Sequence, residues 1–378
     1  MTAGSYDVAV IGGGAIGSAT ARELARRGAR VVVIERDTPG RAATWAAGGM
    51  LSPLAEAAEP GRFLDFALAS LERFPGLVES LREETGLEIE YRDNGKLLVA
   101  LDDEELSRLE AGYAWRRETG QPVTWLDAGD ARRLEPSLSP ETRAAILLGN
   151  DHRLDNRQFG HALWLAAERA GVEFRLGAPA LRVDRSADGA RVTGVTLLDG
   201  ETIVAGAVVV AAGAWSAQID GLPRRLPMIP VRGQIIALRA VPPLIDHVVL
   251  GAGAYLIPRG NGQVLVGATA ERAGFRIECT AGGISRLLGS ALSLLPGLED
   301  APVVETWAGL RPGTPDERPI LGPDPEVSGL FYATGHYRNG ILLTPITAEL
   351  VAAAVLGAAP ADAFDGFAPD RFNEAVVA

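Results

Sequence analysis

The chain of 378 residues is poor in cysteine and lysine, and each shortage limits what the protein can be. Cys279 is the only cysteine, so an internal disulfide framework and a metal site built from several cysteines are both excluded. We interpret it as a small, partly buried apolar residue, consistent with a reducing compartment. Lys96 is the only lysine among 36 basic residues, a bias that by itself predicts no function.

The chain also lacks net positive charge and long apolar runs. Its 48 acidic and 36 basic residues give a net charge of −12, which disfavours nucleic acid or an anionic membrane as a partner. Residues 1–7 lack the basic and apolar segments of a secretory leader, and uncharged stretches such as residues 202–215 are too short to span a membrane. The sequence predicts a soluble cytoplasmic protein that captures any anionic ligand with a few placed cations.

Apolar residues make up 47% of the chain, enough for a sizeable core, and the length suggests two or three domains. The clearest pattern is a strand–helix–strand unit at the start. Residues 8–11 and 31–34 are continuous apolar runs, which favour parallel strands buried on both faces. The helix between them is predicted to end at Gly28. Its outward face is predicted to carry Arg22, Glu23, Arg26 and Arg27.

A Gly-x-Gly-x-x-Gly motif joins the first strand to this helix. Gly12 permits a tight turn, Gly14 lets the backbone approach a pyrophosphate, and Gly17 allows close helix–strand packing. Glu35 ends the second strand, 18 residues after Gly17, and can accept hydrogen bonds from ribose hydroxyls. An acid here favours a free ribose 2′-hydroxyl, so the motif predicts FAD or NAD rather than NADP.

The middle of the chain interrupts the parallel pattern. Short strands, expected to be antiparallel, are predicted at residues 232–238, 255–258, 264–267 and 303–310. Helices are predicted at residues 62–74, 77–85, 104–119, 163–169, 284–295 and 345–356. Residues 88–101 are predicted to form a hairpin that turns at Asp93 to Gly95. Because the chain inserts this antiparallel material and returns late, at residues 329–343, the long insertion favours a flavoprotein over an NAD enzyme.

Longer motifs carry a family resemblance. The sequence resembles the D-amino-acid-oxidase-like FAD-dependent amine oxidases, and most closely the glycine oxidases of thiamine biosynthesis. The matching segments are residues 10–18, 46–51, 209–216, 255–259, 307–316 and 335–343. The last two read Trp-Ala-Gly-Leu-Arg-Pro-Gly-Thr-Pro-Asp and Gly-His-Tyr-Arg-Asn-Gly-Ile-Leu-Leu, and they are far more specific than the glycine motif.

The resemblance implies an α/β fold in which a Rossmann-like FAD-binding domain with a mixed sheet is interleaved with a substrate domain built on an antiparallel sheet. The FAD-binding domain would comprise residues 1–84, 146–222 and 318–378, and the substrate domain residues 85–145 and 223–317. Residues 310–314, where some sarcosine oxidases attach their flavin, contain no cysteine, so FAD is expected to bind non-covalently. The resemblance also implies a homo-oligomer, specifically a tetramer.

The resemblance and the glycine motif together predict a set of FAD-binding residues. They are Gly12, Gly14, Ala15, Ile16, Gly17, Glu35, Arg36, Ala43, Thr44, Gly48, Gly49, Met50, Val183, Gly213, His336, Tyr337, Arg338, Asn339, Gly340, Ile341 and Leu342. His336 is expected to pack or to act through its backbone, not as a base. The N-terminus of the last helix would place partial positive charge near the flavin.

Three residues are predicted to bind the substrate. By resemblance, Arg311 pairs with the substrate carboxylate, which a planar guanidinium can grip with two hydrogen bonds. Tyr255 would donate a hydrogen bond to the same carboxylate, and Arg338 would contact the substrate partly through its backbone. No side chain is predicted to act as a catalytic acid or base. Gly253 and Ala270 are smaller than the pocket residues of glycine oxidases, so D-alanine, D-proline and N-alkylated glycines join glycine as candidate substrates.

These features imply FAD-dependent oxidative deamination of glycine or a small amino acid. The amine would be oxidised to an imine, water would convert it to a 2-oxo acid and ammonia, and oxygen would be reduced to hydrogen peroxide. The imine could instead supply thiamine thiazole synthesis. Two alternatives stay open: a D-amino-acid or sarcosine oxidase or dehydrogenase with another electron acceptor, and an FAD-bearing scaffold without activity. The carboxylate-binding residues argue against the scaffold.

Overall fold

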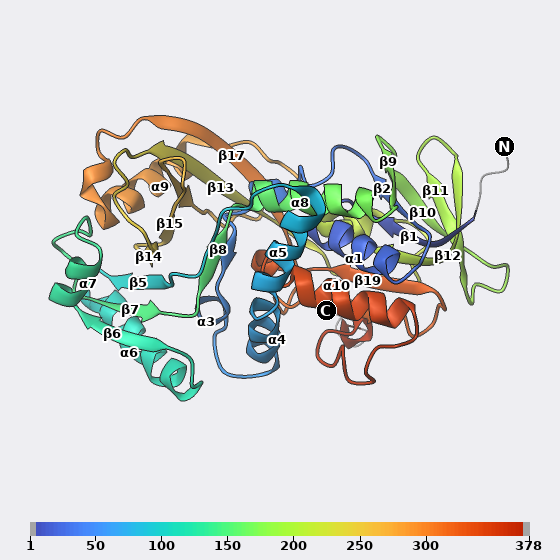
Figure 1. Ribbon diagram of the computed structural model, residues 1–378, viewed down its shortest axis with the longest axis horizontal. Helices are drawn as coiled ribbons and strands as arrows, with labels where there is room; N and C mark the ends of the chain where they lie inside the picture. The colour runs from blue at the N-terminus through green and yellow to red at the C-terminus, as the bar shows by residue number, and fades with distance from the viewer. Residues whose placement is uncertain (1–4, 373–378) are drawn as a thin grey trace.

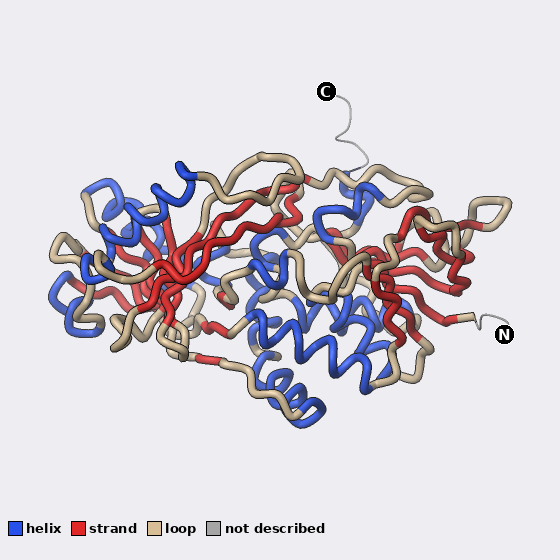
Figure 2. The backbone as a smooth tube through the Cα atoms, turned by 90° about the horizontal axis from the view of Figure 1, so that it is seen from above, coloured by secondary structure: helices blue, strands red, loops and turns tan. Residues whose placement is uncertain are grey.

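Two large β-sheets lie at opposite ends of the computed structural model, which describes residues 5–372 (Figures 1 and 2). Residues 1–4 and 373–378, at the outer ends of the predicted FAD-binding domain, lie outside the described part of the chain. The first sheet contains, in spatial order, β10 (Ala180–Arg185), β11 (Val192–Leu197), β12 (Thr202–Val210), β1 (Tyr6–Ile11), β2 (Val31–Glu35) and β9 (Glu173–Leu176), with β19 (Leu330–Thr334) beside β12 and β18 (Ile320–Pro323) beside β19.

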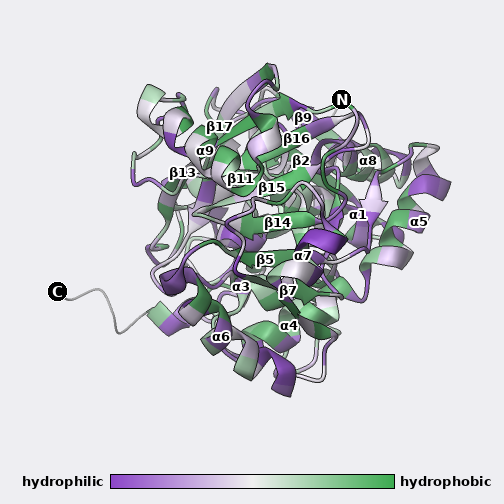
Figure 3. Ribbon diagram, turned by 90° about the vertical axis from the view of Figure 1, so that its left-hand side faces the viewer, coloured by the Kyte–Doolittle hydropathy of each residue, from purple (hydrophilic) through white to green (hydrophobic). Residues whose placement is uncertain are grey.

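The second sheet is formed mainly by the middle of the chain. It contains β17 (Val303–Gly313), β13 (Ile229–Arg239), β16 (Gln263–Gly267), β15 (Ala254–Pro258), β14 (Val248–Gly251), β5 (Lys96–Ala100), β7 (Ala144–Leu148) and β6 (Val123–Asp127). Its strand pairs are antiparallel except for β14 with β5, as expected for this part of the chain. In Figure 3, β14, β15 and β5 are strongly apolar, whereas α6 (Asp103–Glu118), which packs against β5, β6 and β7, carries hydrophilic residues.

The other elements connect and cover the two sheets. A small sheet contains β3 (Met50–Leu51), β8 (His152–Leu154) and β4 (Tyr91–Arg92). The remaining helices are α1 (Ala15–Arg26), α2 (Ala43–Ala46), α3 (Pro53–Glu56), α4 (Arg62–Leu71), α5 (Phe74–Thr85), α7 (Ala128–Leu134), α8 (Asn156–Arg169), α9 (Ala281–Leu294) and α10 (Thr344–Val355). Among the described residues, no helix combines the length and apolarity needed to cross a membrane.

The strands β1 and β2 are buried on both faces, as their apolar runs predict. Successive residues of a strand point to opposite faces. Val8 and Val10 therefore pack with α1, α8 and α10, whereas Ala9 and Ile11 pack with the β10–β11 meander. Strand β1 pairs in parallel with β2 on one side and with β12 on the other. Successive strands are added to the sheet on one side of β1 and then on the other. The carboxyl ends of the strands at such a point form a crevice that favours ligand binding.

The prediction of a hairpin over residues 88–101 is wrong. Strand β4 pairs with β8 in the small sheet, whereas β5 pairs with β7 and β14 in the second sheet. A turn at Gly95, with φ of +84°, is present, but it passes the chain from one sheet to another. All five residues of β5 are buried, and β5 has a partner strand on each edge, which a two-stranded hairpin could not supply.

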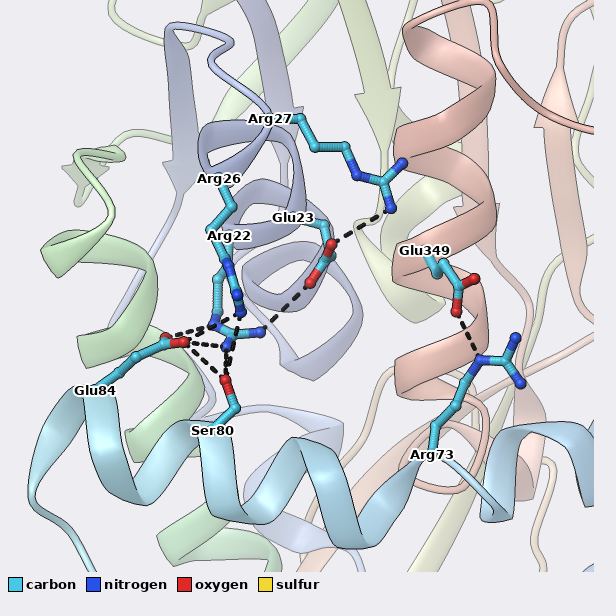
Figure 4. A network of polar contacts seen from close by, with 8 residues as sticks. All are labelled: Arg22, Glu23, Arg26, Arg27, Arg73, Ser80, Glu84 and Glu349. Atoms are coloured by element: carbon cyan, nitrogen blue, oxygen red, sulfur yellow. Dashed lines mark hydrogen bonds and ion pairs between the residues drawn. The ribbon is translucent and has the colours of Figure 1, made fainter.

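The prediction that Arg22 faces solvent is also wrong. Its side chain is 3% exposed and points from α1 toward α5, where Nε donates to Glu84 Oε2 over 2.7 Å and Nη2 donates to Ser80 Oγ over 2.7 Å (Figure 4). These partners satisfy a guanidinium that would otherwise be costly to bury. Arg26 and Arg27 are exposed as predicted. Helical periodicity identifies one apolar face of α1, but it does not reveal that α5 covers a polar one.

The two large sheets lie in different parts of the sequence. The first sheet draws on residues 6–35, 173–210 and 320–334, and the second on residues 96–148 and 229–313. Strand β7 belongs to the second sheet and crosses the predicted domain boundary between residues 145 and 146.

Candidate active site

A cavity of about 540 Å³ extends from the glycine motif to the second sheet. All but three of the residues predicted to bind FAD or substrate line it. Of the three, Gly17 lies against the carbonyl of Gly12, so it allows close packing and does not line the wall. Val183 lies in β10, where its N–H donates to Asp220 O over 2.9 Å, and Leu342 belongs to the apolar core.

The nucleotide end of the cavity is built from backbone. Gly12 has φ of +109°, and a Cβ there would lie 2.5 Å from Ala211 O. The N–H of Gly13 donates to Glu35 Oε2 over 2.7 Å, and the N–H of Ala15 donates to Thr44 Oγ1 over 2.9 Å. Gly14, Ala15 and Ile16 line the cavity at the start of α1, where the N–H groups of the first helical turn and the helix dipole favour a phosphate.

Side chains complete this end around the position expected for a ribose. Glu35 also accepts from the N–H of Asp37 over 3.0 Å, so backbone amides hold its carboxylate while it lines the cavity. Its remaining lone pairs can accept from ribose hydroxyls. The guanidinium of Arg36 stacks over the ring of Trp215 at 3.6 Å, and both line the cavity. Trp215 is absent from the predicted site, although it stands in the matching segment 209–216.

The loop expected along the flavin packs tightly against the second sheet. A Cβ on Gly48 would lie 2.7 Å from Ile257 Cδ1, so any larger residue would force the Ile257 side chain to move. Two buried side chains hold the loop: Arg259 Nη2 donates to Gly48 O over 2.9 Å, and Asn156 Nδ2 donates to Thr44 O over 2.8 Å. Sequence reasoning missed both supports, although Arg259 ends the matching segment 255–259.

His336 is buried in the cavity wall, in the segment that leads into α10. Burial lowers its pKa to about 3, so the ring is neutral at physiological pH. Its Nε2 lies 3.1 Å from Thr347 Oγ1 within α10. A neutral ring tied to the last helix suits packing better than proton transfer.

Arg311 and Tyr255 come together at the substrate end. Arg311 lies in β17, and its Nη1 donates to Thr269 O over 3.0 Å. A Cβ on Gly233 would lie 2.5 Å from Arg311 Nη1, and a Cβ on Gly267 would lie 2.5 Å from the Tyr255 hydroxyl. Each glycine thus makes room for one substrate-end side chain on a neighbouring strand. Sequence reasoning missed both, and the available signal is a glycine inside a strand.

The electrostatics of this end suit a carboxylate. Burial raises the pKa of Tyr255, while the nearby Arg311 guanidinium opposes that rise. The tyrosine therefore keeps its proton at neutral pH and can donate it in a hydrogen bond. The guanidinium of Arg311 is bonded to a backbone carbonyl, which leaves further N–H groups for a bidentate contact.

Arg338 meets an acidic residue that is absent from the predicted site. Its Nε lies 3.0 Å from Glu56 Oε2, and Nη2 lies 3.9 Å from Glu317 Oε2. Glu56 lines the cavity together with Arg338. Gly253 and Ala270 also line it, and a Cβ on Gly253 would meet nothing within 4 Å. The substrate end therefore has open space beside it, as their small size predicts.

Comparisons with known proteins find relatives named glycine oxidase and ThiO/ThiG. A glycine oxidase from Geobacillus kaustophilus is 39% identical over 350 residues, which cover 92% of each chain. A bifunctional protein ThiO/ThiG from Synechocystis sp. is 38% identical over 373 residues, which cover 97% of this chain and 54% of that protein. The crystal structure of glycine oxidase from Geobacillus kaustophilus superposes with a TM-score of 0.92 and 37% identity, covering 97% of this chain and 99% of that chain.

The family assignment rests on the sequence and on the fit of the cavity. The Gly12 turn, the start of α1, Glu35 and the close-packed Gly48 loop form a continuous wall that suits a dinucleotide joined to a flat ring system. The prediction of an FAD enzyme with the α/β fold is thereby confirmed. The sequence profile described as FAD dependent oxidoreductase (DAO) matches residues 7–354, and the chain belongs to this family.

Proposed function

We propose that the protein is an FAD-dependent oxidase of glycine and other small amino acids. The observation that carries the proposal is the meeting of Arg311 and Tyr255 on the wall of the same cavity that holds the FAD motif. The relatives named glycine oxidase support the substrate class. The products are a 2-oxo acid, ammonia and hydrogen peroxide, formed through an imine.

The chain's own residues mainly bind and orient the substrate. Arg311, fixed by Thr269 O, grips the carboxylate, and the Tyr255 hydroxyl donates to it. These contacts fix the orientation of the substrate Cα–H bond, and such positioning is a large part of catalysis. FAD, when bound, would supply the oxidant that accepts the hydride of this bond, while the amine loses a proton and becomes the imine, and oxygen would then take up the two electrons. Water then hydrolyses the imine, releasing ammonia.

The open space beside Gly253 and Ala270 favours a second group of substrates. D-alanine, D-proline and sarcosine carry one to three more carbon atoms than glycine, and no larger side chain stands at these two positions. We therefore propose that the protein accepts them as well. The resemblance further supports delivery of the imine to thiazole synthesis, a homotetramer and a cytoplasmic location, which remain proposals.

Anaerobic flavin reduction tests the function without depending on the electron acceptor. The holoenzyme is mixed with glycine, sarcosine, D-alanine or D-proline, and bleaching of the yellow flavin is followed. Bleaching by at least one of them is expected, and failure with all four would contradict the proposal. Oxygen consumption with stoichiometric peroxide then separates an oxidase from a dehydrogenase that uses a quinone or a carrier protein.

A further inference from the structure

The substrate end of the cavity contains a carboxylate that the proposed reaction does not use. Among the described residues that line the cavity, the acidic side chains are Glu35 and Glu56. Glu35 lies at the nucleotide end, where backbone amides hold it. Glu56 lies at the end of α3 and contacts Arg338, one of the residues predicted to meet the substrate. Its negative charge therefore acts on any further charged group of the substrate, beyond the carboxylate bound by Arg311 and Tyr255.

Glu56 forms an ion pair with Arg338. The Nε of Arg338 lies 3.0 Å from Glu56 Oε2, so the negative charge of Glu56 offsets the positive charge of Arg338. Behind Glu56, the buried Nζ of Lys96 contacts Ser52 Oγ and lies 3.9 Å from Asp151 Oδ2. The positive charge of Arg338 is thus matched by a carboxylate, whereas Arg311 Nη1 donates to the backbone carbonyl of Thr269.

Glu56 also acts on the carboxylate-binding residues. Burial raises the pKa of Tyr255, and after the opposing effect of Arg311 the negative charge of Glu56 raises it further. The field of Glu56 therefore reaches the Tyr255 hydroxyl. The same field repels any carboxylate in this part of the cavity, but a second carboxylate lacks the Arg311 and Tyr255 contacts that offset the repulsion of the first. In a partly buried site such repulsion is screened weakly.

Size does not exclude a second carboxylate. Gly253 and Ala270 leave open space in the same cavity, and a Cβ at Gly253 would meet nothing within 4 Å. An amino acid with a carboxymethyl group on its nitrogen, such as iminodiacetate, is longer than glycine but still small. Discrimination between the two must therefore depend on charge.

We propose that Glu56 restricts the site to amines that carry one carboxylate, by neutralising Arg338 and repelling a second carboxylate in the space beside Gly253 and Ala270. This inference rests on the proposed function, because it assumes that Arg311 and Tyr255 hold the first carboxylate. Glu56 is a specificity residue here. Its effect is therefore measured as the ratio of the kcat/KM values for two substrates that differ in charge.

The decisive variant is Glu56→Gln, which keeps a hydrogen-bonding side chain beside Arg338 but removes the charge. We measure kcat/KM for iminodiacetate and for glycine in the holoenzyme. The ratio of the two is expected to rise at least about 10-fold, because a repulsion between close charges is replaced by a neutral contact. A change below threefold in a variant that retains FAD would overturn the proposal.

Glu317→Gln is the matched control. Glu317 also faces Arg338, at 3.9 Å, but its side chain is 61% exposed and it does not line the cavity. Solvent screens such a pair, so the same ratio is expected to change less than twofold. A rise in Glu317→Gln equal to that in Glu56→Gln would also overturn the proposal, because any loss of negative charge near Arg338 would then suffice.

A measurement on the unmodified protein covers the case in which Glu56→Gln does not fold. Acetate, malonate and monomethyl malonate are titrated into the holoenzyme, and binding is followed by the change in flavin absorbance. Malonate is expected to bind at least about 10-fold more weakly than its monomethyl ester, which has nearly the same size and one charge less. Equal or tighter binding of malonate would overturn the inference. Reduction of the flavin by glycine tests the proposed function separately.

Discussion

The two ends of the cavity use glycine in different ways. At the nucleotide end, glycine serves the backbone: Gly12 takes a φ of +109° and brings the chain against Ala211. At the substrate end, glycine serves other side chains, because Gly233 makes room for Arg311 and Gly267 for Tyr255. The first end binds through N–H groups fixed by local conformation, and the second binds through side chains that meet across strands.

This difference separates the two functions of the cavity. A change in local backbone conformation should weaken cofactor binding. A change in a cross-strand contact should weaken substrate binding and leave the cofactor bound. The following variants test that separation, from the largest expected effect to the smallest.

Gly12→Ala is expected to have the largest effect. The new Cβ would lie 2.5 Å from Ala211 O at a φ that L side chains rarely adopt, so the turn must deform. We expect FAD to bind more than about 100-fold more weakly, since strain of this kind costs roughly 1–3 kcal/mol before the clash is counted. Equilibrium dialysis or flavin fluorescence measures the dissociation constant.

Gly28→Ala is the control for positive φ alone. Gly28 has a φ of +92° at the end of α1, but its Cβ would meet nothing within 4 Å. It should lower the thermal stability while FAD affinity stays within about threefold of the parent protein. If both variants lost FAD equally, local strain anywhere in α1 would explain the result, and the nucleotide end would have no special role.

Arg311→Ala tests the substrate end directly. Loss of a charged hydrogen bond costs about 1.5–3 kcal/mol, so KM for glycine should rise roughly 10- to 150-fold while FAD remains bound. Steady-state kinetics together with the flavin content of the purified protein measure both quantities. A change below twofold in kcat/KM would show that Arg311 does not bind the substrate carboxylate.

Gly233→Ala tests whether the position of the Arg311 guanidinium depends on the space beside Gly233. The added Cβ would lie 2.5–2.6 Å from three guanidinium atoms of Arg311, so the guanidinium must move. We expect a loss of about 10-fold in kcat/KM with FAD binding unchanged, because a small misplacement of a positioning group is costly. In the double variant with Arg311→Ala, the loss caused by Gly233→Ala should largely disappear. Losses that simply add would show that Gly233 acts independently of Arg311.

The same contrast explains what the sequence could predict. The nucleotide end follows from residues 8–35 alone, because a strand, three glycines and an acid lie within one strand–helix–strand unit. The substrate end depends on pairs distant in sequence, so Arg311 and Tyr255 were predicted through the family resemblance, whereas Gly233, Gly267 and Glu56 were missed.

The two errors in the fold have the same origin. A turn signal at Asp93 to Gly95 marks a change of direction, but it does not state which sheet each flanking strand joins. Helical periodicity in α1 identifies an apolar face, but it does not reveal that Ser80 and Glu84 of α5 cover Arg22. Both features are decided by tertiary partners, which a single sequence does not specify.

The smallest expected effect concerns the buried side chains of Lys96 and Asp151 near the substrate end. Burial raises the pKa of Asp151 to about 7, although Lys96 opposes the rise. The folded protein therefore holds more protons on this group than the unfolded chain between about pH 4 and pH 7. Its contribution to stability is present at the lower pH and is lost as the pH rises through 7. Asp151→Asn should remove this loss, so the melting temperature of the variant should gain a few degrees relative to the parent protein between pH 5 and pH 8. A constant difference across this range would mean that Asp151 is ionised throughout, and that the substrate end is held by a permanent Lys96–Asp151 ion pair.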